Sequence, residues 1–198
     1  MRSSVVVLAV AMCLAVVPMA AQDAVKTPMM FTAFAVNLNQ PASMGGQRLP
    51  SAGTLQISLD RFSTSEERAT LVAAFKEGGQ NALLRALQRV NERVGFIRNP
   101  GSLGWDLRFA YREVNADGTS RIVIATDRRI EFWEARNRPR VSDFPFTLIE
   151  MHLDKAGSGE GRMAVAASIS TARDGETIVI ENYSISPVAL NNITMTSR

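Results

Sequence analysis

Residues 105–126, WDLRFAYREVNADGTSRIVIAT, decide the fold of this chain. From 105 to 111, large apolar or aromatic side chains occupy every second position, with polar or small side chains between them. This alternation is typical of a β-strand that buries one face. Asp117-Gly118 readily supplies the positive φ that a tight hairpin turn requires. Residues 121–126 then return as a nearly all-apolar strand, so the segment predicts an antiparallel hairpin.

The same period of two recurs on both sides of this hairpin. Residues 54–60 alternate strictly, which places Leu55, Ile57 and Leu59 on one face. Further segments read as short strands between turns or loops: 31–38, 130–135, 146–153, 163–170, 177–183 and 188–195. About eight strands at this spacing predict an α+β fold that is predominantly antiparallel β, arranged as a sandwich or a barrel-like sheet.

The period changes to that of a helix after residue 60. Ser63-Thr64-Ser65-Glu66 has the form of a capping box, in which the first hydroxyl accepts from a helical amide and the Glu reaches back. Apolar residues at helical spacing continue to Gly78-Gly79, and a second apolar stripe ends at Gly95. The sequence therefore predicts a two-helix insertion near the N-terminus, at about 64–77 and 81–94.

The first 21 residues have the pattern of a secretory signal peptide. Arg2 is followed by an uncharged apolar run over 5–17, and small residues near Ala20 and Ala21 mark a cleavage site. The run is shorter than the roughly 20 residues that span a bilayer. We expect a signal peptide at 1–21, an N-terminal strand and loop at 22–53, and a β-rich domain at 54–198. The mature protein is expected to be exported, without stable membrane insertion.

Composition limits the chemistry that is open to the protein. With 46% hydrophobic and 21% charged residues, it is an ordinary globular chain of a length that suits one domain. The net charge of +3 is too small to indicate a nucleic-acid partner, and its Arg residues are interleaved with acidic ones as in cross-strand ion pairs. Cys13 is the only cysteine and lies in the expected leader. A cysteine-free mature domain excludes thiol catalysis and iron–sulfur clusters.

One pair of titratable side chains stands out as a catalytic candidate. His152 is the only histidine, and Glu150 lies two residues earlier, so both point from one face of a strand, roughly 7 Å apart along it. A half-buried Glu/His pair can act as general acid and base. The alternative is a hydrogen-bonded structural pair. No pattern of metal ligands is present, so the sequence predicts neither a metal nor a cofactor.

Aromatic residues gather in the middle of the chain, where they either line a ligand pocket or fill the core. The core is the more common fate of inward-facing aromatic residues. The cluster comprises Trp105, Phe109, Tyr111, Phe132, Trp133, Phe144 and Phe146. If a ligand is bound instead, the candidate contacts are Arg108, Trp133 and Glu181.

The stretches WDLRFAYREVN (105–115), TDRRIEFWEA (126–135) and ENY (181–183) resemble those of short exported bacterial proteins that have no assigned activity. The resemblance extends over most of the chain after residue 50. It implies a shared fold and a periplasmic or secreted location in a bacterium, and it implies no function.

Three functional hypotheses remain open from the sequence. The first is a non-catalytic exported β module that binds a small ligand or a protein partner. The second is a metal-independent enzyme, a hydrolase or an isomerase, that uses Glu150 and His152. The third is a structural envelope component whose edge strand pairs with a partner.

Overall fold

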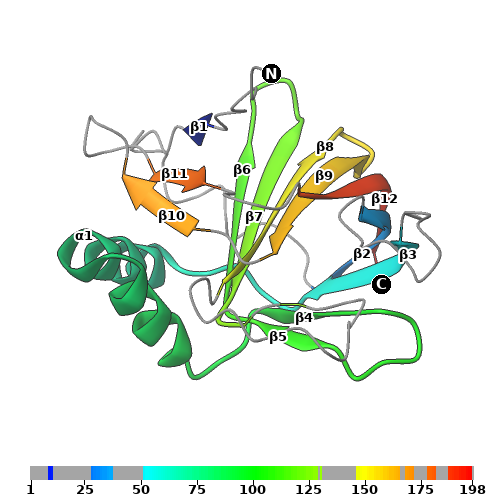
Figure 1. Cartoon of the computed structure of the whole chain (residues 1–198). Coiled ribbons are helices and arrows are strands. Elements are labelled where there is room, and N and C mark those ends of the chain that lie inside the picture. The colour runs from blue at the N-terminus through cyan, green and yellow to red at the C-terminus, as the bar shows by residue number, and fades with distance from the viewer. Residues whose placement is uncertain are drawn as a thin grey trace, which may run out of the picture.

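The computed structural model in Figure 1 describes residues 9–10, 28–37, 51–128, 130, 146–165, 168–171, 178–181 and 187–197. Most of them form a single nine-stranded antiparallel sheet that curls into a nearly closed barrel. In spatial order the strands are β5 (Trp105–Leu107), β4 (Gly95–Arg98), β3 (Ser51–Leu59), β2 (Met29–Asn37), β12 (Val188–Ser197), β9 (Ser158–Val165), β8 (Thr147–Leu153), β7 (Ser120–Thr126) and β6 (Phe109–Val114).

Two further elements accompany the barrel. The helix α1 (Ser65–Gln88) is inserted between β3 and β4. A separate three-stranded sheet has the order β1 (Ala9–Val10), β11 (Ile178–Glu181) and β10 (Ser168–Thr171). The predicted class, mostly antiparallel β with a barrel-like sheet, is confirmed. The details differ from the prediction, because the main sheet has nine strands and the described residues contain one helix instead of two.

A single bent strand joins the two ends of the sheet. β5 pairs with β4 and β6 pairs with β7, yet only Arg108 separates β5 from β6. The Arg108 amide donates to the carbonyl of Ala125 at 3.0 Å, and Phe109 also has Ala125 as its register partner. Two residues that oppose one constitute a β-bulge, which bends the strand. With 105–114 counted as one strand, eight strands run up and down around the barrel.

The bulge also changes which side chains face inward. Leu107 and Ala110 are both 0% exposed and belong to the same core, although three positions separate them. The alternation of the sequence predicts Trp105, Leu107, Phe109 and Tyr111 on one face. That prediction is wrong beyond Leu107, because the extra residue at the bulge turns Phe109 and Tyr111 to the outer face.

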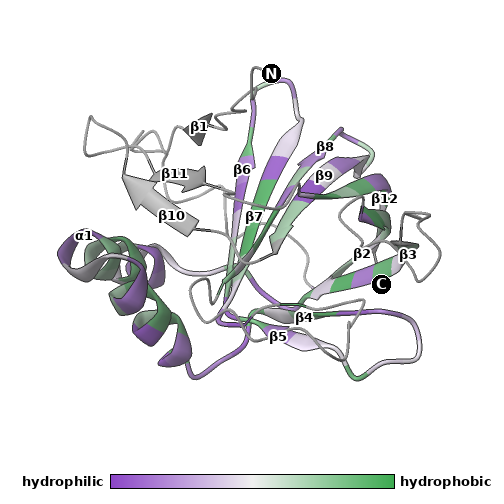
Figure 2. Ribbon diagram, in the orientation of Figure 1, coloured by the Kyte–Doolittle hydropathy of each residue, from purple (hydrophilic) through white to green (hydrophobic). Residues whose placement is uncertain are grey.

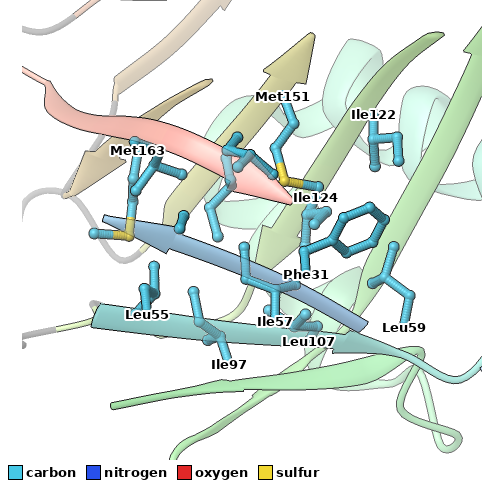
Figure 3. Close-up of a cluster of buried hydrophobic side chains, with 14 of the residues drawn as sticks. Phe31, Leu55, Ile57, Leu59, Ile97, Leu107, Ile122, Ile124, Met151 and Met163 are labelled. Carbon is cyan, nitrogen blue, oxygen red and sulfur yellow. The ribbon is translucent and has the colours of Figure 1, made fainter. Parts of the chain in front are cut away.

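The barrel interior is filled by one cluster of apolar side chains, to which all nine strands contribute (Figure 3). No member is more than 5% exposed. The labelled side chains in Figure 3 converge from opposite walls and meet at the centre: Phe31, Leu55, Ile57, Leu59, Ile97, Leu107, Ile122, Ile124, Met151 and Met163. Burial of each large side chain contributes about 1.5–3 kcal/mol, so this cluster is the main source of stability.

The helix begins one residue later than the sequence predicts. Thr64 is the N-cap, and its hydroxyl accepts from the Glu67 amide at 3.2 Å while the Glu67 carboxylate accepts from the Thr64 amide at 2.8 Å. The predicted box used Ser63 and Glu66. Ser63 instead contacts β6, where its Oγ accepts from the Ala110 amide at 3.2 Å and its own amide donates to the Ala110 carbonyl at 2.8 Å.

The two predicted helices are one helix with a kink. Gly78 and Gly79 have non-helical backbone angles, and Gly79 has φ 60° and ψ −152°, a conformation that is open almost only to glycine. The second half ends at Gln88, six residues before the predicted end at 94. The chain then turns into β4, a four-residue strand that is too short to show a period in the sequence.

The helix covers part of the outer face of the barrel. Its buried side chains Leu71, Phe75 and Leu87 form a second cluster with Phe146, and Phe109 and Leu148 pack against this cluster. Figure 2 shows the hydrophobic colouring on α1 confined to part of its surface. The aromatic residues that the structure describes in the predicted cluster are therefore mainly packing residues.

Several predictions fall on residues that the structure does not describe. Most of the predicted leader and of the predicted strand at 130–135 lies outside the described residues, as do Phe132, Trp133 and Phe144. Of the leader, only Ala9–Val10 is described, and it pairs with β11. Among the described residues, no helix combines the length and the apolar character that a membrane crossing requires.

Candidate functional site

The candidate pair Glu150 and His152 lies on the outer face of the wall formed by β6, β7, β8 and β9. Residues that are paired directly across an antiparallel sheet project from the same face. The register therefore arranges outer side chains in rows across the four strands. In chain order, one row contains Tyr111, Val123, Glu150 and Arg162, and the next contains Glu113, Arg121, His152 and Glu160.

Glu150 is the centre of a small charged cluster in these rows. Its Oε1 lies 2.5 Å from the Arg121 Nε, which donates to it, and 3.3 Å from the His152 Nε2. Arg121 is also within 3.8 Å of the Glu113 carboxylate. The structure thus brings the predicted pair together and adds Arg121, a residue that the sequence analysis did not single out.

The exposure of these side chains sets the chemistry that they can perform. The Glu150 side chain is 16% exposed and that of Arg121 21%, whereas the His152 side chain is 66% exposed. The Glu150 oxygen that faces the imidazole is the one that accepts the short hydrogen bond from Arg121. Glu150 is therefore held by Arg121 at the same oxygen that would exchange a proton with His152. The arrangement suits a structural ion pair on a strand surface.

Arg108 contributes to a different contact. Its Nε lies 3.5 Å from the Asp127 Oδ1, and its Nη1 donates to the carbonyl of Val90 at 3.4 Å. The two side chains are only 19% and 9% exposed. Arg108 therefore fastens the segment after α1 to the end of β7. No ion pair or hydrogen bond between Arg108 and the Glu150 cluster is present among the described residues.

The other two candidate ligand contacts stay predictions. Trp133 lies outside the described residues. Glu181 is the last residue of β11, where its backbone pairs with Ser168, and its side chain is outside the description.

The described part of the chain gives no evidence of a metal site. No group of three or more His, Cys, Asp or Glu side chains is close enough there to hold an ion. The charged residues of the outer face are instead arranged as alternating opposite charges, as the interleaving of Arg with Asp and Glu in the sequence suggested. Arg93 with Asp106 and Arg121 with Glu113 are further examples.

One polar residue that the sequence analysis did not single out is unusual. Arg112 is the register partner of Ile122, a core residue that is 0% exposed, so its side chain starts from the inner face of the barrel wall. Its Nε is out of contact with solvent and has no hydrogen-bond partner among the described residues. Burial lowers the pKa of the Arg112 guanidinium, which remains charged at neutral pH. The only sequence signal was an Arg within an alternating strand.

Comparison with known proteins adds no assignment to this geometry. No protein-family model matches the chain, and the searches of the curated proteins and of the solved structures gave no significant match. The function must therefore be argued from the barrel, its charged outer face and its edges.

Proposed function

We propose that this chain is an exported, non-catalytic β-barrel module that binds a protein partner through its outer surface. The observation that carries the proposal is the filled interior. Side chains from all nine strands meet inside the barrel, and a barrel of about eight strands is just wide enough to be filled in this way. With the interior used as core, the outer walls and the strand edges remain for recognition.

The geometry of Glu150 supports the non-catalytic part of the proposal. The carboxylate is engaged by Arg121 at 2.5 Å, and His152 beside it is largely exposed on the outer wall. General acid–base catalysis works best in a site that shields the reacting groups from water. An exposed ion pair across two strands is explained by its contribution to the sheet alone.

A metal-independent hydrolase or isomerase is the second candidate, and the 3.3 Å contact between Glu150 and His152 is the observation in its favour. The substitutions Glu150→Gln and His152→Gln separate it from the binding module. An enzyme that uses the pair would lose turnover by about a hundredfold or more on removal of its acid or base. A binding module would retain its partner in both variants, with a matched Glu160→Gln variant as the control.

Native mass spectrometry of the protein recovered from the cells that produce it tests the main proposal. We expect a complex with a stoichiometric protein partner that survives mild desalting. Recovery of the bare chain, together with a hydrolytic or isomerase activity that Glu150→Gln abolishes, would overturn the proposal. A tightly retained small molecule would show that the module binds a ligand instead of a protein.

Export is a separate part of the proposal, and it is supported by the apolar run and small residues of the first 21 positions. Sequencing of the N-terminus of the cell-derived protein tests it. We expect the mature chain to begin at residue 21 or 22. A chain that retains residues 1–21 in the cytoplasm would contradict export.

A further inference from the structure

In the described part of the chain, β6 has an edge without a neighbouring strand, which is called the open edge below and comprises residues 111–114. Among the described strands, β6 is the last of the main sheet and β7 is its only sheet neighbour. The amide and the carbonyl of Ala110 both turn away from β7, toward Ser63. Because the two edges of an antiparallel strand alternate residue by residue, the N–H and C=O groups of Arg112 and Val114 face the same way. Beyond Ala110 along β6, no described residue forms a backbone hydrogen bond with these groups of Arg112 and Val114.

Side chains at this edge add a charge and an apolar surface. The Arg112 guanidinium has a buried Nε for which no acceptor is described. Val114 is 51% exposed, although its side chain projects from the same inner face of the wall as that of Arg112. An edge without a neighbouring strand among the described residues, a positively charged guanidinium and an exposed aliphatic side chain lie within three residues, and together they form a template for an added strand. A carboxylate is the group that a planar guanidinium binds best, through two parallel hydrogen bonds.

We propose that the open edge of β6 binds an extended acidic segment of the protein partner as an added strand, with a partner carboxylate on Arg112 and an apolar partner side chain on Val114. The inference rests on the proposed function and identifies the surface and the partner chemistry. In an antiparallel addition, the residues opposite Arg112 and Val114 project from the same face as these two. Read from its N-terminus, the partner segment therefore has an apolar residue opposite Val114, then any residue, then an acidic residue opposite Arg112.

An inward-pointing charge is also a way in which natural edge strands avoid pairing with other chains. Two features favour recognition over that role. A charge that prevents pairing works best when it is fully hydrated, whereas one nitrogen of the Arg112 guanidinium, its Nε, is out of contact with solvent. An edge that is protected by a charge also lacks an exposed apolar surface beside that charge, whereas Val114 is exposed next to Arg112 on the same face.

The test uses the full mature chain, labelled with ¹⁵N, and a blocked pentapeptide of sequence TVTET as the probe. We expect the amides of Arg112 and Val114 to exchange with solvent quickly in the free protein and to become protected when the probe is added. The amides of Tyr111 and Glu113 point toward β7 and stay protected throughout. This alternate-residue pattern is specific for strand addition.

Matched variants separate the contributions of charge and backbone. Arg112→Gln, or a TVTQT probe on the unaltered protein, is expected to weaken binding about tenfold, since one charge-assisted pair is lost. Val114→Pro removes the edge amide, which an edge strand tolerates, and is expected to abolish the protection. Val114→Ala keeps that amide, and Arg85→Gln removes an exposed charge on α1, so both are expected to retain protection.

Each other outcome overturns this inference in a recognisable way. Equal binding of TVTET and TVTQT would remove the role of the Arg112 charge. Binding of free acetate at Arg112 without amide protection at Val114 would identify a small-anion site instead of a strand site. If the native partner is retained while the probe perturbs no β6 amide, the binding module stands and only the choice of edge is wrong.

Discussion

At the residue scale, the best-defined electrostatic contact joins the start of α1 to the loop before it. Arg61 donates two hydrogen bonds of 2.8 Å, one to each carboxylate oxygen of Glu67, and Glu67 also closes the capping box with Thr64. The hydrogen bond from Arg61 lowers the pKa of Glu67, against the opposing effect of burial. The Glu67 side chain thus stabilises both the start of α1 and the attachment of α1 to the preceding loop.

This contact predicts a pH dependence. A carboxylate whose pKa in the folded state is below its ordinary value near 4.5 stabilises the fold above that pH and loses this contribution as the pH falls through the folded-state pKa. Glu67→Gln is expected to lower the free energy of unfolding by about 1–2 kcal/mol at pH 7 and to cost progressively less below about pH 4.5. Urea denaturation at pH 7, 5 and 3 measures the difference. The exposed Glu77→Gln is the control, and a pH-independent cost for Glu67→Gln would contradict the prediction.

Asn192 is another residue whose role is set by backbone geometry. Its φ is 51°, the only positive value for a non-glycine residue in the described part of the chain, and the register of β12 shifts at this position. The side chain is exposed, so packing does not compensate for strain. Asn192→Gly is expected to change stability by less than about 0.5 kcal/mol, whereas Asn192→Val is expected to cost about 1–2 kcal/mol. Thermal unfolding of both variants checks this, and equal melting temperatures would contradict it.

At the scale of elements, α1 depends on its kink. Leu71 and Phe75 lie before Gly78-Gly79 and Leu87 lies after it, yet all three belong to the same cluster against the barrel. A straight helix would rotate the second half away from this surface. The kink therefore lets one helix contribute two segments to a single cluster.

Substitution at the kink separates helix propensity from packing. Alanine is a better helix former than glycine by about 1 kcal/mol, so an isolated helix would gain from Gly79→Ala. In this fold we expect a loss of about 1–3 kcal/mol, because alanine is strained at φ 60° and ψ −152°. Gly53→Ala is the control, since an added Cβ there meets no atom within 4 Å and the backbone is extended. A higher urea midpoint for Gly79→Ala would show that the kink is dispensable.

At the scale of the whole molecule, β12 holds the barrel together. It pairs with β2 on one side and β9 on the other, and it supplies Val188, Leu190 and Ile193 to the core. The first and last strands of the barrel, β2 and β12, are therefore direct neighbours. Figure 1 shows β12 between β9 and β2.

A truncation tests this dependence. Removal of residues 188–198 is expected to abolish cooperative unfolding altogether, because it opens the barrel and exposes the apolar faces of β2 and β9. Near-UV circular dichroism and urea denaturation provide the measurement, with a deletion of Arg198 alone as the control. A truncated chain that still unfolds cooperatively would show that β12 is a peripheral strand.

The sequence by itself determined the class of fold. The alternation along 54–60, the apolar run at 121–126 and the Asp117-Gly118 turn are local features that depend only on the order of residues. The same is true of the helical period after residue 64 and of the glycine pair that interrupts it. The proximity of Glu150 and His152 was also predictable, because the two residues occupy one face of a single strand.

Only the tertiary structure decided how these elements close and which side chains meet. Three features depend on partners that are distant in sequence and leave no local pattern: the bulge at Arg108, the four-residue strand β4, and the contact of Ser63 with Ala110. The position of Arg121 on Glu150 depends on the pairing of β7 with β8, and the open edge at Arg112 depends on where the neighbouring segment turns away. Register and closure arise from long-range hydrogen bonds and packing, so a reading of local periodicity cannot supply them.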